Sequence, residues 1–289
     1  MRSPENPWHC RSMPLPVSKS QVAKLGERLV TGRATGADWN LYAEVLDAYD
    51  QNTTSVRAAI DAVDWSAVLG RPIDLAVTAR TKTLGTLLDK LMRTPAVKLP
   101  AIRDISGVRI VGDLVLSEQD VVANHLIDLF ECQDAKPVDR RAEPMSGYRA
   151  LHIVIVSDGL PVEVQIRTEL QALWADLYER LADTWGRQIR YGEAPLPGPD
   201  GSVELRAAAV SALQALSVDQ FAAFEHLRDI AHRVIALVPD TELGPVEVDQ
   251  EKLDKLVEQS RDLQQQGDEV HAQLKERLSK LAEIFDSLA

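Results

Sequence analysis

Cysteines and long apolar runs are both scarce in this chain, and each absence narrows its setting. The two cysteines, Cys10 and Cys132, lie far apart and form no C-x-x-C pair, which argues against a disulfide framework and a cysteine-based metal site. No apolar run approaches the roughly 20 residues that span a bilayer. No apolar stretch follows Arg2, so the start does not read as a secretory signal. We expect a cytoplasmic protein without membrane insertion.

Basic residues are also in deficit, with 32 against 44 acidic ones, for a net charge of −12. This charge at first opposes a nucleic-acid partner, because phosphate binding needs a cationic surface. The acidity is concentrated, however: residues 240–289 hold 13 acidic and six basic residues, whereas residues 71–109 hold three acidic and eight basic ones. A local cationic site is therefore compatible with the composition, and binding of a polyanion there should depend strongly on salt.

Turn-forming and apolar residues divide the chain into four stretches. Four prolines within residues 1–18 predict a flexible leader, in which Met13 is a candidate internal start. Apolar residues at helical spacing predict N-terminal helices over 19–70, with Asp38 as a candidate N-cap. A core over 71–190 and a helical region over 200–289 follow.

The core stretch combines helical and β-like patterns. A helix-like segment over 83–92 precedes three runs rich in β-branched residues, and a segment with helical spacing over 121–131 separates the first two runs. The three β-like runs cover 102–114, 148–156 and 160–168. The sequence predicts an α/β (α+β) fold, in which a mixed, largely antiparallel sheet is flanked by helices and extended by helical regions at both ends.

The C-terminal residues suggest a long helix with an apolar seam. Apolar residues over 253–288 recur at three- and four-residue steps, close to a heptad pattern that Ser260 and Gly267 weaken. Two interpretations stay open: the helix packs back onto its own domain, or it pairs with a second chain.

A cationic segment, Arg80-Thr-Lys82-Thr-Leu-Gly-Thr86-Leu-Leu-Asp-Lys90, is the first candidate for chemistry. If it enters a helix, Lys82, Thr86 and Lys90 lie four residues apart on one face, with Arg80 at the entrance. Two ammonium groups, a hydroxyl and a guanidinium in this arrangement suit a polyphosphate. A solvated basic face is the simpler alternative.

The β-like runs add carboxylates and an aromatic ring. On strands, Asp104 and Glu163 would present carboxylates beside the cationic helix, and Mg²⁺ is usually held by one or two carboxylates plus phosphate oxygens. The ring of Tyr148 would be available to stack on a base. Strand-edge salt bridges and a half-buried strand tyrosine are the structural alternatives.

Taken in order, four blocks resemble the synthetase domain of the RelA/SpoT family, the pyrophosphokinases that make the alarmone (p)ppGpp. They are R-T-K-x-x-x-T-x-x-x-K over 80–90, D-I-S-G-V-R over 104–109, G-Y-R-A-L-H over 147–152 and E-V-Q-I-R-T over 163–168. The resemblance implies transfer of the β,γ-pyrophosphate of ATP to a ribose 3′-hydroxyl with Mg²⁺ as cofactor. It also implies the mixed sheet flanked by helices.

The resemblance further implies a role for each matching residue. On the ATP side, Arg80 would hold the adenine, and the phosphates would contact Lys82, Thr86 and Lys90. At the reaction centre, Asp104 would bind Mg²⁺ and Glu163 would be a second metal ligand or the base that activates the hydroxyl, with Arg109 as a further catalytic residue. On the acceptor side, Tyr148 would stack on the base. The remaining acceptor-side and transition-state contacts would come from His152, Gln165 and Arg167.

The acceptor side departs from the family's pattern. Synthetases of guanosine nucleotides commonly carry a Lys and an Asn four and two residues before the Tyr, where this chain has Pro144 and Ser146. The usual Glu-His pair after Trp-Ala is replaced by Tyr178-Glu179. The pattern is similar to that of the family's toxic small synthetases, which antitoxins hold in check and many of which pyrophosphorylate the 3′-terminal adenosine of tRNA.

We therefore expect a translation-inhibiting toxin that modifies the CCA end of tRNA. An alarmone synthetase that uses GTP or GDP is the alternative, and a catalytically silent binding module is the second alternative. The partner would be a neutralising antitoxin or a second copy bound through the C-terminal helices. Bifunctional family members hydrolyse alarmone through a His-Asp domain, and no His-Asp dipeptide occurs here, so we expect no hydrolase activity.

Overall fold

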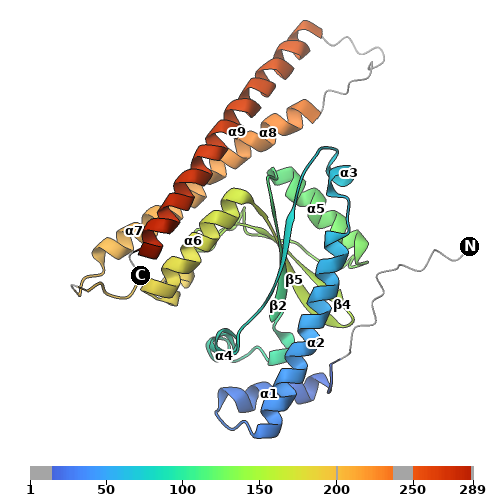
Figure 1. Cartoon of the computed structure of the whole chain (residues 1–289), viewed down its shortest axis with the longest axis vertical. Coiled ribbons are helices and arrows are strands. Elements are labelled where there is room, and N and C mark those ends of the chain that lie inside the picture. Colours follow the sequence, from blue (N-terminus) through green and yellow to red (C-terminus); the bar gives the residue numbers. More distant parts are fainter. Residues whose placement is uncertain (1–14, 200, 237–249, 288–289) are drawn as a thin grey trace, which may run out of the picture. The chain divides into compact units, whose positions relative to one another are not determined.

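The computed structural model describes residues 15–199, 201–236 and 250–287 (Figure 1). Most of the predicted leader, including Met13, lies outside the described residues. Contacts between residues divide the chain into two compact units. The first contains the residues up to Ile110, Val122–Val138 and His152–Ile166. The second contains Val111–Val121, Asp139–Leu151 and the residues from Arg167 onward. The predicted division at 70, 190 and 200 stays a prediction.

Three helices begin the chain, and their caps explain where they start. They are α1 (Lys19–Val30), α2 (Gly36–Asp61) and α3 (Trp65–Leu69). The prediction of Asp38 as N-cap is wrong: the N-cap of α2 is Thr35, and Asp38 is the third residue of a capping box with it. The Asp38 carboxylate also accepts from Arg28 of α1 at 2.5 Å, so it joins the two helices.

Five strands form one mixed sheet in the order β1-β2-β5-β4-β3. The predicted β-like runs contain β2 (Ser106–Gly112), β4 (Leu151–Ser157) and β5 (Leu160–Thr168). A two-residue turn joins β4 to β5, and both of its residues, Asp158 and Gly159, have positive φ, as tight hairpin turns require. The predicted α/β (α+β) class, a mixed sheet with helices, is confirmed.

Two strands are not predicted from the sequence. In β1 (Ala76–Thr81) the only fully buried residue is Val77, so no apolar alternation marks the strand. The other, β3 (Val138–Asp139), is two residues long and carries no pattern at all.

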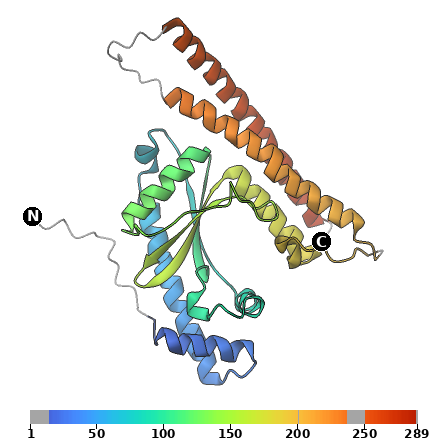
Figure 2. The ribbon, with the colours of Figure 1, turned by 180° about the vertical axis from the view of Figure 1, so that it is seen from behind.

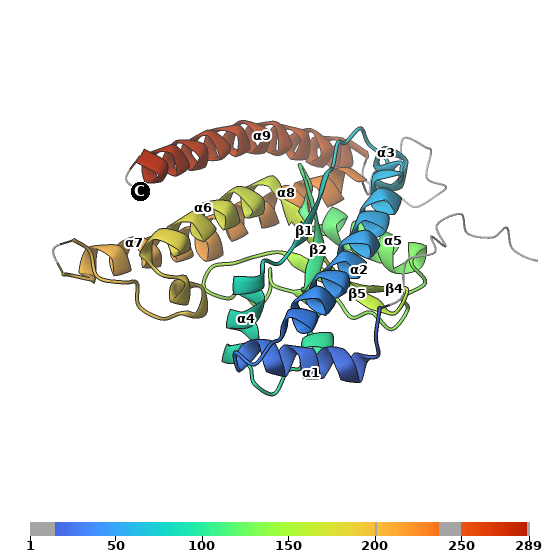
Figure 3. The ribbon, with the colours of Figure 1, turned by 60° about the horizontal axis from the view of Figure 1, so that its bottom comes forward.

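The two helices that the sequence predicts in the core stretch are both present. The expected helix over 83–92 is confirmed as α4 (Leu84–Arg93), and the expected helix over 121–131 begins earlier, as α5 (Leu116–Leu129). In the first unit, α1 packs against α4 (Figure 3), and their apolar side chains form a core with α2. A 3-10 turn, η1 (Leu99–Ala101), contributes the fully buried Leu99 to this core.

The second unit is mostly helical. The helix α6 (Glu169–Trp185) is followed by a 3-10 turn, η2 (Arg187–Tyr191), and then by a continuous helical run. The run comprises α7 (Glu204–Ala215), the π-helix η3 (Leu216–Phe221) and α8 (Ala222–Ala236). The last helix is α9 (Gln250–Ser287), which lies beside α8 and contacts α6 (Figures 1 and 2). Of the two interpretations of the C-terminal helix, the structure shows packing back onto its own unit.

The apolar seam of α9 is only partly the face that packs. Ser260 is buried, Gly267 faces Arg228 of α8, and Leu278 joins the core of the second unit. Four seam residues that the heptad pattern would bury are instead largely exposed: Leu256, Leu263, Val270 and Leu281. The pattern over 253–288 therefore combines a packing face with an exposed apolar face.

One helical run is an exception to the predicted lack of a membrane-spanning segment. By length and composition alone, Glu204–Ala236 is apolar enough to cross a bilayer. A single helix of this kind is weak evidence. This run also carries two buried carboxylates, Glu225 and Asp229, which bind partners within the second unit.

Candidate active site

Half-buried polar side chains line one face of the sheet. Along β2, β4 and β5, buried apolar residues alternate with partly exposed residues. Because successive side chains of a strand point to opposite faces, this alternation puts the partly exposed residues on one face. Four predicted site residues occupy such positions: Arg109 on β2, His152 on β4, and Glu163 and Gln165 on β5.

Asp104, two residues before β2, brings together the two lysines that were predicted to bind phosphates. Lys90 Nζ lies 2.6 Å from Asp104 Oδ1, and Lys82 Nζ lies 3.3 Å from Oδ2. The exposed fractions of the three side chains are 24% for Asp104, 24% for Lys82 and 31% for Lys90. The three groups are therefore paired with one another and still accessible to a charged ligand.

The two lysines reach Asp104 from different local structures, which corrects the predicted helical face. Thr83 is the N-cap of α4, so Lys82 lies before the helix, where its backbone N–H donates to Ile105 O at 2.8 Å. Only Lys90 and Thr86 lie on the helix. The Thr86 hydroxyl donates to Thr83 O at 2.9 Å, which ties it to the cap.

The other cationic residue of this segment, Arg80, is not at the helix entrance. It lies on β1, two residues before Lys82, and is exposed. The cationic side chains of residues 80–90 therefore come from a strand, a connection and a helix.

A glycine explains how β2 comes close to β5 beside the site. A Cβ atom on Gly107 would lie 2.6 Å from the backbone oxygen of Glu163, closer than real Cβ contacts allow. Glycine at this position of D-I-S-G-V-R thus permits the approach of the two strands. The close approach fixes the backbone of Glu163 beside the strand that follows Asp104.

Glu163 is held as an anion. His152 Nδ1 lies 3.3 Å from Glu163 Oε1, and the Gln165 amide donates to Oε2 at 2.8 Å. Burial by itself raises the pKa of Glu163, but the hydrogen bond and charge of His152, the Gln165 amide and the Lys82 ammonium together lower it to about 2. The charge of Lys82 thus acts on Glu163 as well as on Asp104.

Tyr148 and Arg167 form a pair within the second unit. Arg167 Nη2 donates to the Tyr148 hydroxyl at 2.9 Å, and the guanidinium carbon lies 5.0 Å from the centre of the ring. Ser146 and Gly147 both have positive φ, so a tight turn precedes the tyrosine. Arg167 is 3% exposed, whereas the tyrosine ring is half-buried. The ring is thus held by the buried Arg167, and part of it is accessible to solvent.

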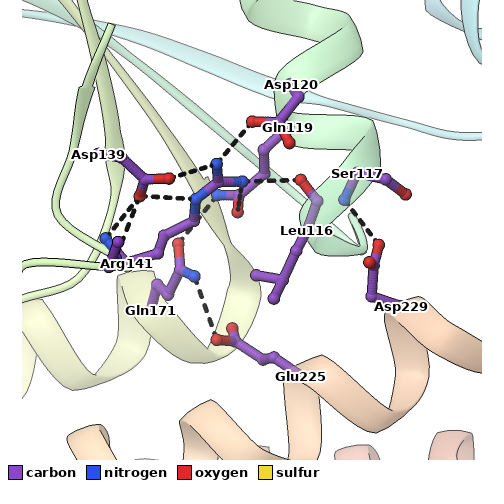
Figure 4. A network of polar contacts seen from close by, with 10 residues as sticks. Leu116, Ser117, Gln119, Asp120, Asp139, Arg141, Gln171, Glu225 and Asp229 are labelled. Carbon is purple, nitrogen blue, oxygen red and sulfur yellow. Dashed lines mark hydrogen bonds and ion pairs between the residues drawn. The ribbon is translucent and has the colours of Figure 1, made fainter.

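A buried polar network in the second unit is not predicted by any sequence pattern (Figure 4). Arg141 donates to Asp139 at 2.8 Å and to Gln119 at 3.4 Å. Gln119 donates to Gln171 at 2.9 Å, and Gln171 donates to Glu225 at 3.2 Å. Apart from Asp139 and Arg141, these partners lie far apart along the chain, so local periodicity carries no signal of them.

A second cluster joins the start of α6 to α9. His271 is 5% exposed, and its two ring nitrogens lie 3.5 Å from Asp113 and 3.8 Å from Glu169. Burial and the charge of Arg228 lower the pKa of His271. Arg228 lies 3.0 Å from Asp113 and Lys275 lies 2.5 Å from Glu169, so both carboxylates already have cationic partners. The arrangement is that of an ion-pair network rather than of a metal centre.

Part of the chain is similar to known sequences. Residues 79–182 match the family model described as "Region found in RelA / SpoT proteins". Uncharacterized proteins of Mycobacterium bovis and Mycobacterium tuberculosis are 42% identical over 180 residues, which is 62% of this chain and 64% of theirs. The chain thus spans just under two thirds of the length of these relatives.

Two solved structures match part of the chain at low sequence identity. The small alarmone synthetase 1 from Bacillus subtilis matches with a TM-score of 0.49 and 21% identity, over 66% of this chain and 98% of that one. A GTP pyrophosphokinase family protein from Streptococcus pneumoniae matches with a TM-score of 0.48 and 20% identity, over 68% and 98%. The matched residues 79–182 contain all four sequence blocks, so this part of the chain is similar to the RelA/SpoT region.

Proposed function

We propose that the protein is a pyrophosphokinase that transfers the β,γ-pyrophosphate of ATP to a ribose 3′-hydroxyl. The observation that carries the proposal is the pairing of Lys82 and Lys90 on the two oxygens of Asp104, next to an ionised Glu163. In the reaction, the 3′-oxygen bonds to the β-phosphorus and the bond to the α,β-bridging oxygen breaks. AMP leaves with that oxygen, and the hydroxyl proton passes to solvent.

The ion pairs suit a donor that arrives as a polyphosphate. When the triphosphate binds, its oxygens replace Asp104 as partners of Lys82 and Lys90, so no ammonium group has to be created or desolvated for the step. Arg80 supplies a further cation two residues away, on the adenine side. In phosphoryl transfer, positioning and neutralisation of charge supply most of the rate, and these residues provide both.

The carboxylates fit Mg²⁺. Asp104 is partly exposed and Glu163 is ionised at neutral pH, and hard oxygen ligands of this kind are those that Mg²⁺ prefers. Asp104 and Glu163 would hold the ion, which when bound neutralises charge on the phosphate oxygens. A pKa of about 2 also makes Glu163 a weak base near neutral pH, so we assign it to the metal rather than to proton abstraction.

For the acceptor, we favour the 3′-terminal adenosine of tRNA, modified by a toxin-like enzyme. The turn before Tyr148 carries Pro144 and Ser146 and no lysine, so a contact for a 5′-polyphosphate is missing there. Arg141 in the same segment is bound to Asp139 and Asp120 at 2.8 and 2.5 Å. An acceptor recognised by its terminal base and ribose needs no such contact. Within the second unit, Tyr148 would stack on the base beside Arg167. His152 and Gln165, of the first unit, stay predicted acceptor contacts.

A guanosine nucleotide is the second candidate acceptor. The net charge of −12 favours a small nucleotide over a polynucleotide, because long-range repulsion acts on every phosphate of a tRNA. In this case the protein would be a (p)ppGpp synthetase.

The two acceptors are separated by following label from ATP labelled at its γ-phosphorus. With purified protein and Mg²⁺, we expect label in deacylated tRNA and none in tRNA that lacks its terminal adenosine. Label found only in GTP or GDP would support the alarmone synthetase instead. Glu163→Gln should abolish transfer, with the exposed Glu44→Gln as a matched control. Equal transfer by both variants would contradict the role proposed for Glu163, and absence of transfer by the wild type would support a silent binding module.

Three further expectations belong to this proposal. The enzyme would synthesise only, which incubation of labelled product with Mn²⁺ or Mg²⁺ would test, since release of pyrophosphate would contradict it. A toxin of this kind would have a neutralising antitoxin. The exposed apolar face of α9, which includes Leu256 and Leu263, offers a surface for that antitoxin or for a second copy.

A further inference from the structure

We propose that Glu225 of α8 is a positioning residue for the acceptor side of the site. The proposal deepens the proposed function, because it concerns how the acceptor ring Tyr148 is held. It rests on contacts that join the helical run Glu204–Ala236 to the residues on either side of that ring, all within the second unit.

Glu225 binds two residues that each follow an acceptor residue. Its Oε2 accepts from Arg149 Nη1 at 2.6 Å, and its Oε1 accepts from the Thr168 hydroxyl. Arg149 directly follows Tyr148, and Thr168 directly follows Arg167. Tyr148 and Arg167 are themselves hydrogen-bonded, so one carboxylate binds the side chains of the residues that follow both members of the pair.

The residue before the ring is held from the same helical run. The hydroxyl of Ser217, in the π-helix, donates to Gly147 O at 2.6 Å. A Cβ on Gly147 would lie 2.6 Å from the Trp174 ring, so Gly147 is also closely packed against this ring. Tyr148 is therefore flanked by two anchored neighbours, one bound to Ser217 and one to Glu225.

Burial makes the Glu225 contact hard to replace. The side chain of Arg149 is 3% exposed and that of Glu225 is 4% exposed, so water cannot take the place of either partner. Removing the carboxylate leaves a buried guanidinium without its counter-charge, which is strongly unfavourable and forces the segment around Tyr148 to shift. Loss of the carboxylate should therefore weaken binding of the acceptor. Binding of ATP should not change, because the residues of the ATP side lie on other elements.

The same helix offers a matched control. Asp229 is one turn after Glu225, is 6% exposed, and accepts from the backbone N–H of Ser117 at 2.7 Å (Figure 4). It is a buried carboxylate that anchors α8 but contacts neither neighbour of Tyr148 nor of Arg167. Asp229→Asn therefore reports the cost of loosening α8 alone.

The experiment measures KM for acceptor and for ATP separately, in folded wild type, Glu225→Gln, Ser217→Ala and Asp229→Asn. We expect acceptor KM to rise at least tenfold in Glu225→Gln and about threefold in Ser217→Ala, with ATP KM within twofold of wild type. In Asp229→Asn, both KM values should stay within twofold. Unchanged acceptor KM in Glu225→Gln, or an equal rise in Asp229→Asn, would overturn the proposal.

Two controls keep the result interpretable. If Glu225→Gln does not fold, as judged by circular dichroism, Ser217→Ala decides alone: an unchanged acceptor KM in that variant overturns the proposal. If the wild type transfers label to neither tRNA nor guanosine nucleotides, the proposed function fails, and the positioning role fails with it. If the wild type is active and Glu225→Gln matches it, only the positioning role fails.

Discussion

The ammonium group of Lys90 lies 2.6 Å from the carboxylate of Asp104, and Lys82 approaches the other oxygen of the same carboxylate. In the proposed reaction, the two lysines bind phosphate and Asp104 binds the metal ion. In the structure these groups neutralise one another, so each lies near the position that the proposed reaction requires. When metal and ATP bind, the two lysines would exchange the carboxylate for phosphate, and the carboxylate would exchange the lysines for the metal ion.

The first prediction concerns Asp104→Asn. Loss of the carboxylate should lower transfer at least about 100-fold, because charge stabilisation at the phosphates is lost. It should also free Lys82 and Lys90 for the nucleotide, so ATP binding without Mg²⁺ should tighten. Fluorescence titration with a labelled ATP analogue, with Mg²⁺ and with a chelator, measures both effects. The control is Asp89→Asn, at an exposed position of α4, the helix that carries Lys90. Weaker metal-free binding in Asp104→Asn would contradict the exchange of partners.

The second prediction is the pH dependence that Glu163 gives to stability. Its pKa is lowered from 4.5 to about 2 in the folded state, so its contribution is present above the unfolded value and is lost as pH falls toward 2. The difference in unfolding free energy between wild type and Glu163→Gln should therefore shrink between about pH 5 and pH 2, by about 3 kcal/mol at most. Urea unfolding at several pH values measures it, with Glu44→Gln, at an exposed position, as the control. A difference in unfolding free energy that grows as the pH falls would contradict the prediction.

The third prediction compares two glycines. In Gly107→Ala, the new methyl group meets the backbone oxygen of Glu163 at 2.6 Å, so β2 and β5 must separate. We expect a loss of about 1–3 kcal/mol in the free energy of unfolding, together with lower activity. Gly85→Ala in α4 meets nothing within 4 Å and should stabilise the helix by about 0.5–1 kcal/mol. Thermal unfolding of both variants measures whether stability falls in Gly107→Ala and rises in Gly85→Ala. Unchanged stability of Gly107→Ala would show that the two strands are not held this closely.

The parts of the fold that the sequence predicts are those with a local signal. The strands β2, β4 and β5 alternate buried and half-buried residues, and the same alternation puts Glu163 and Gln165 on one face. The strand β1 has a single fully buried residue and therefore no period to detect. The four-residue spacing of Lys82, Thr86 and Lys90 matches a helical face and so predicts Lys82 on the helix. Thr83, a residue type that favours the N-cap, instead begins α4 after Lys82, which therefore lies outside the helix.

The contacts that hold the proposed acceptor side have no local signal in the sequence. Arg149 and Glu225 are 76 residues apart, and Gln171 and Glu225 are 54 apart. Nothing in the pattern around Glu225 distinguishes a buried, bound carboxylate from the solvated one that a helix usually carries. Pairing over such distances is a property of the folded chain, so sequence reasoning finds the ring of Tyr148 and misses what holds it.

The fourth prediction tests which face of α9 stabilises the second unit. Leu278 is 3% exposed and packs in the core cluster that includes Leu170 and Trp174, whereas Leu263 is 61% exposed. Leu278→Ala should lower the free energy of unfolding by about 2–5 kcal/mol, because it leaves a cavity, and Leu263→Ala should change it by less than about 0.5 kcal/mol. If the exposed face binds a second copy, Leu263→Ala should instead lower the mass measured by light scattering without lowering monomer stability. The two variants thus separate packing within the unit from association between chains, and equal destabilisation by both would contradict the face assigned to each residue.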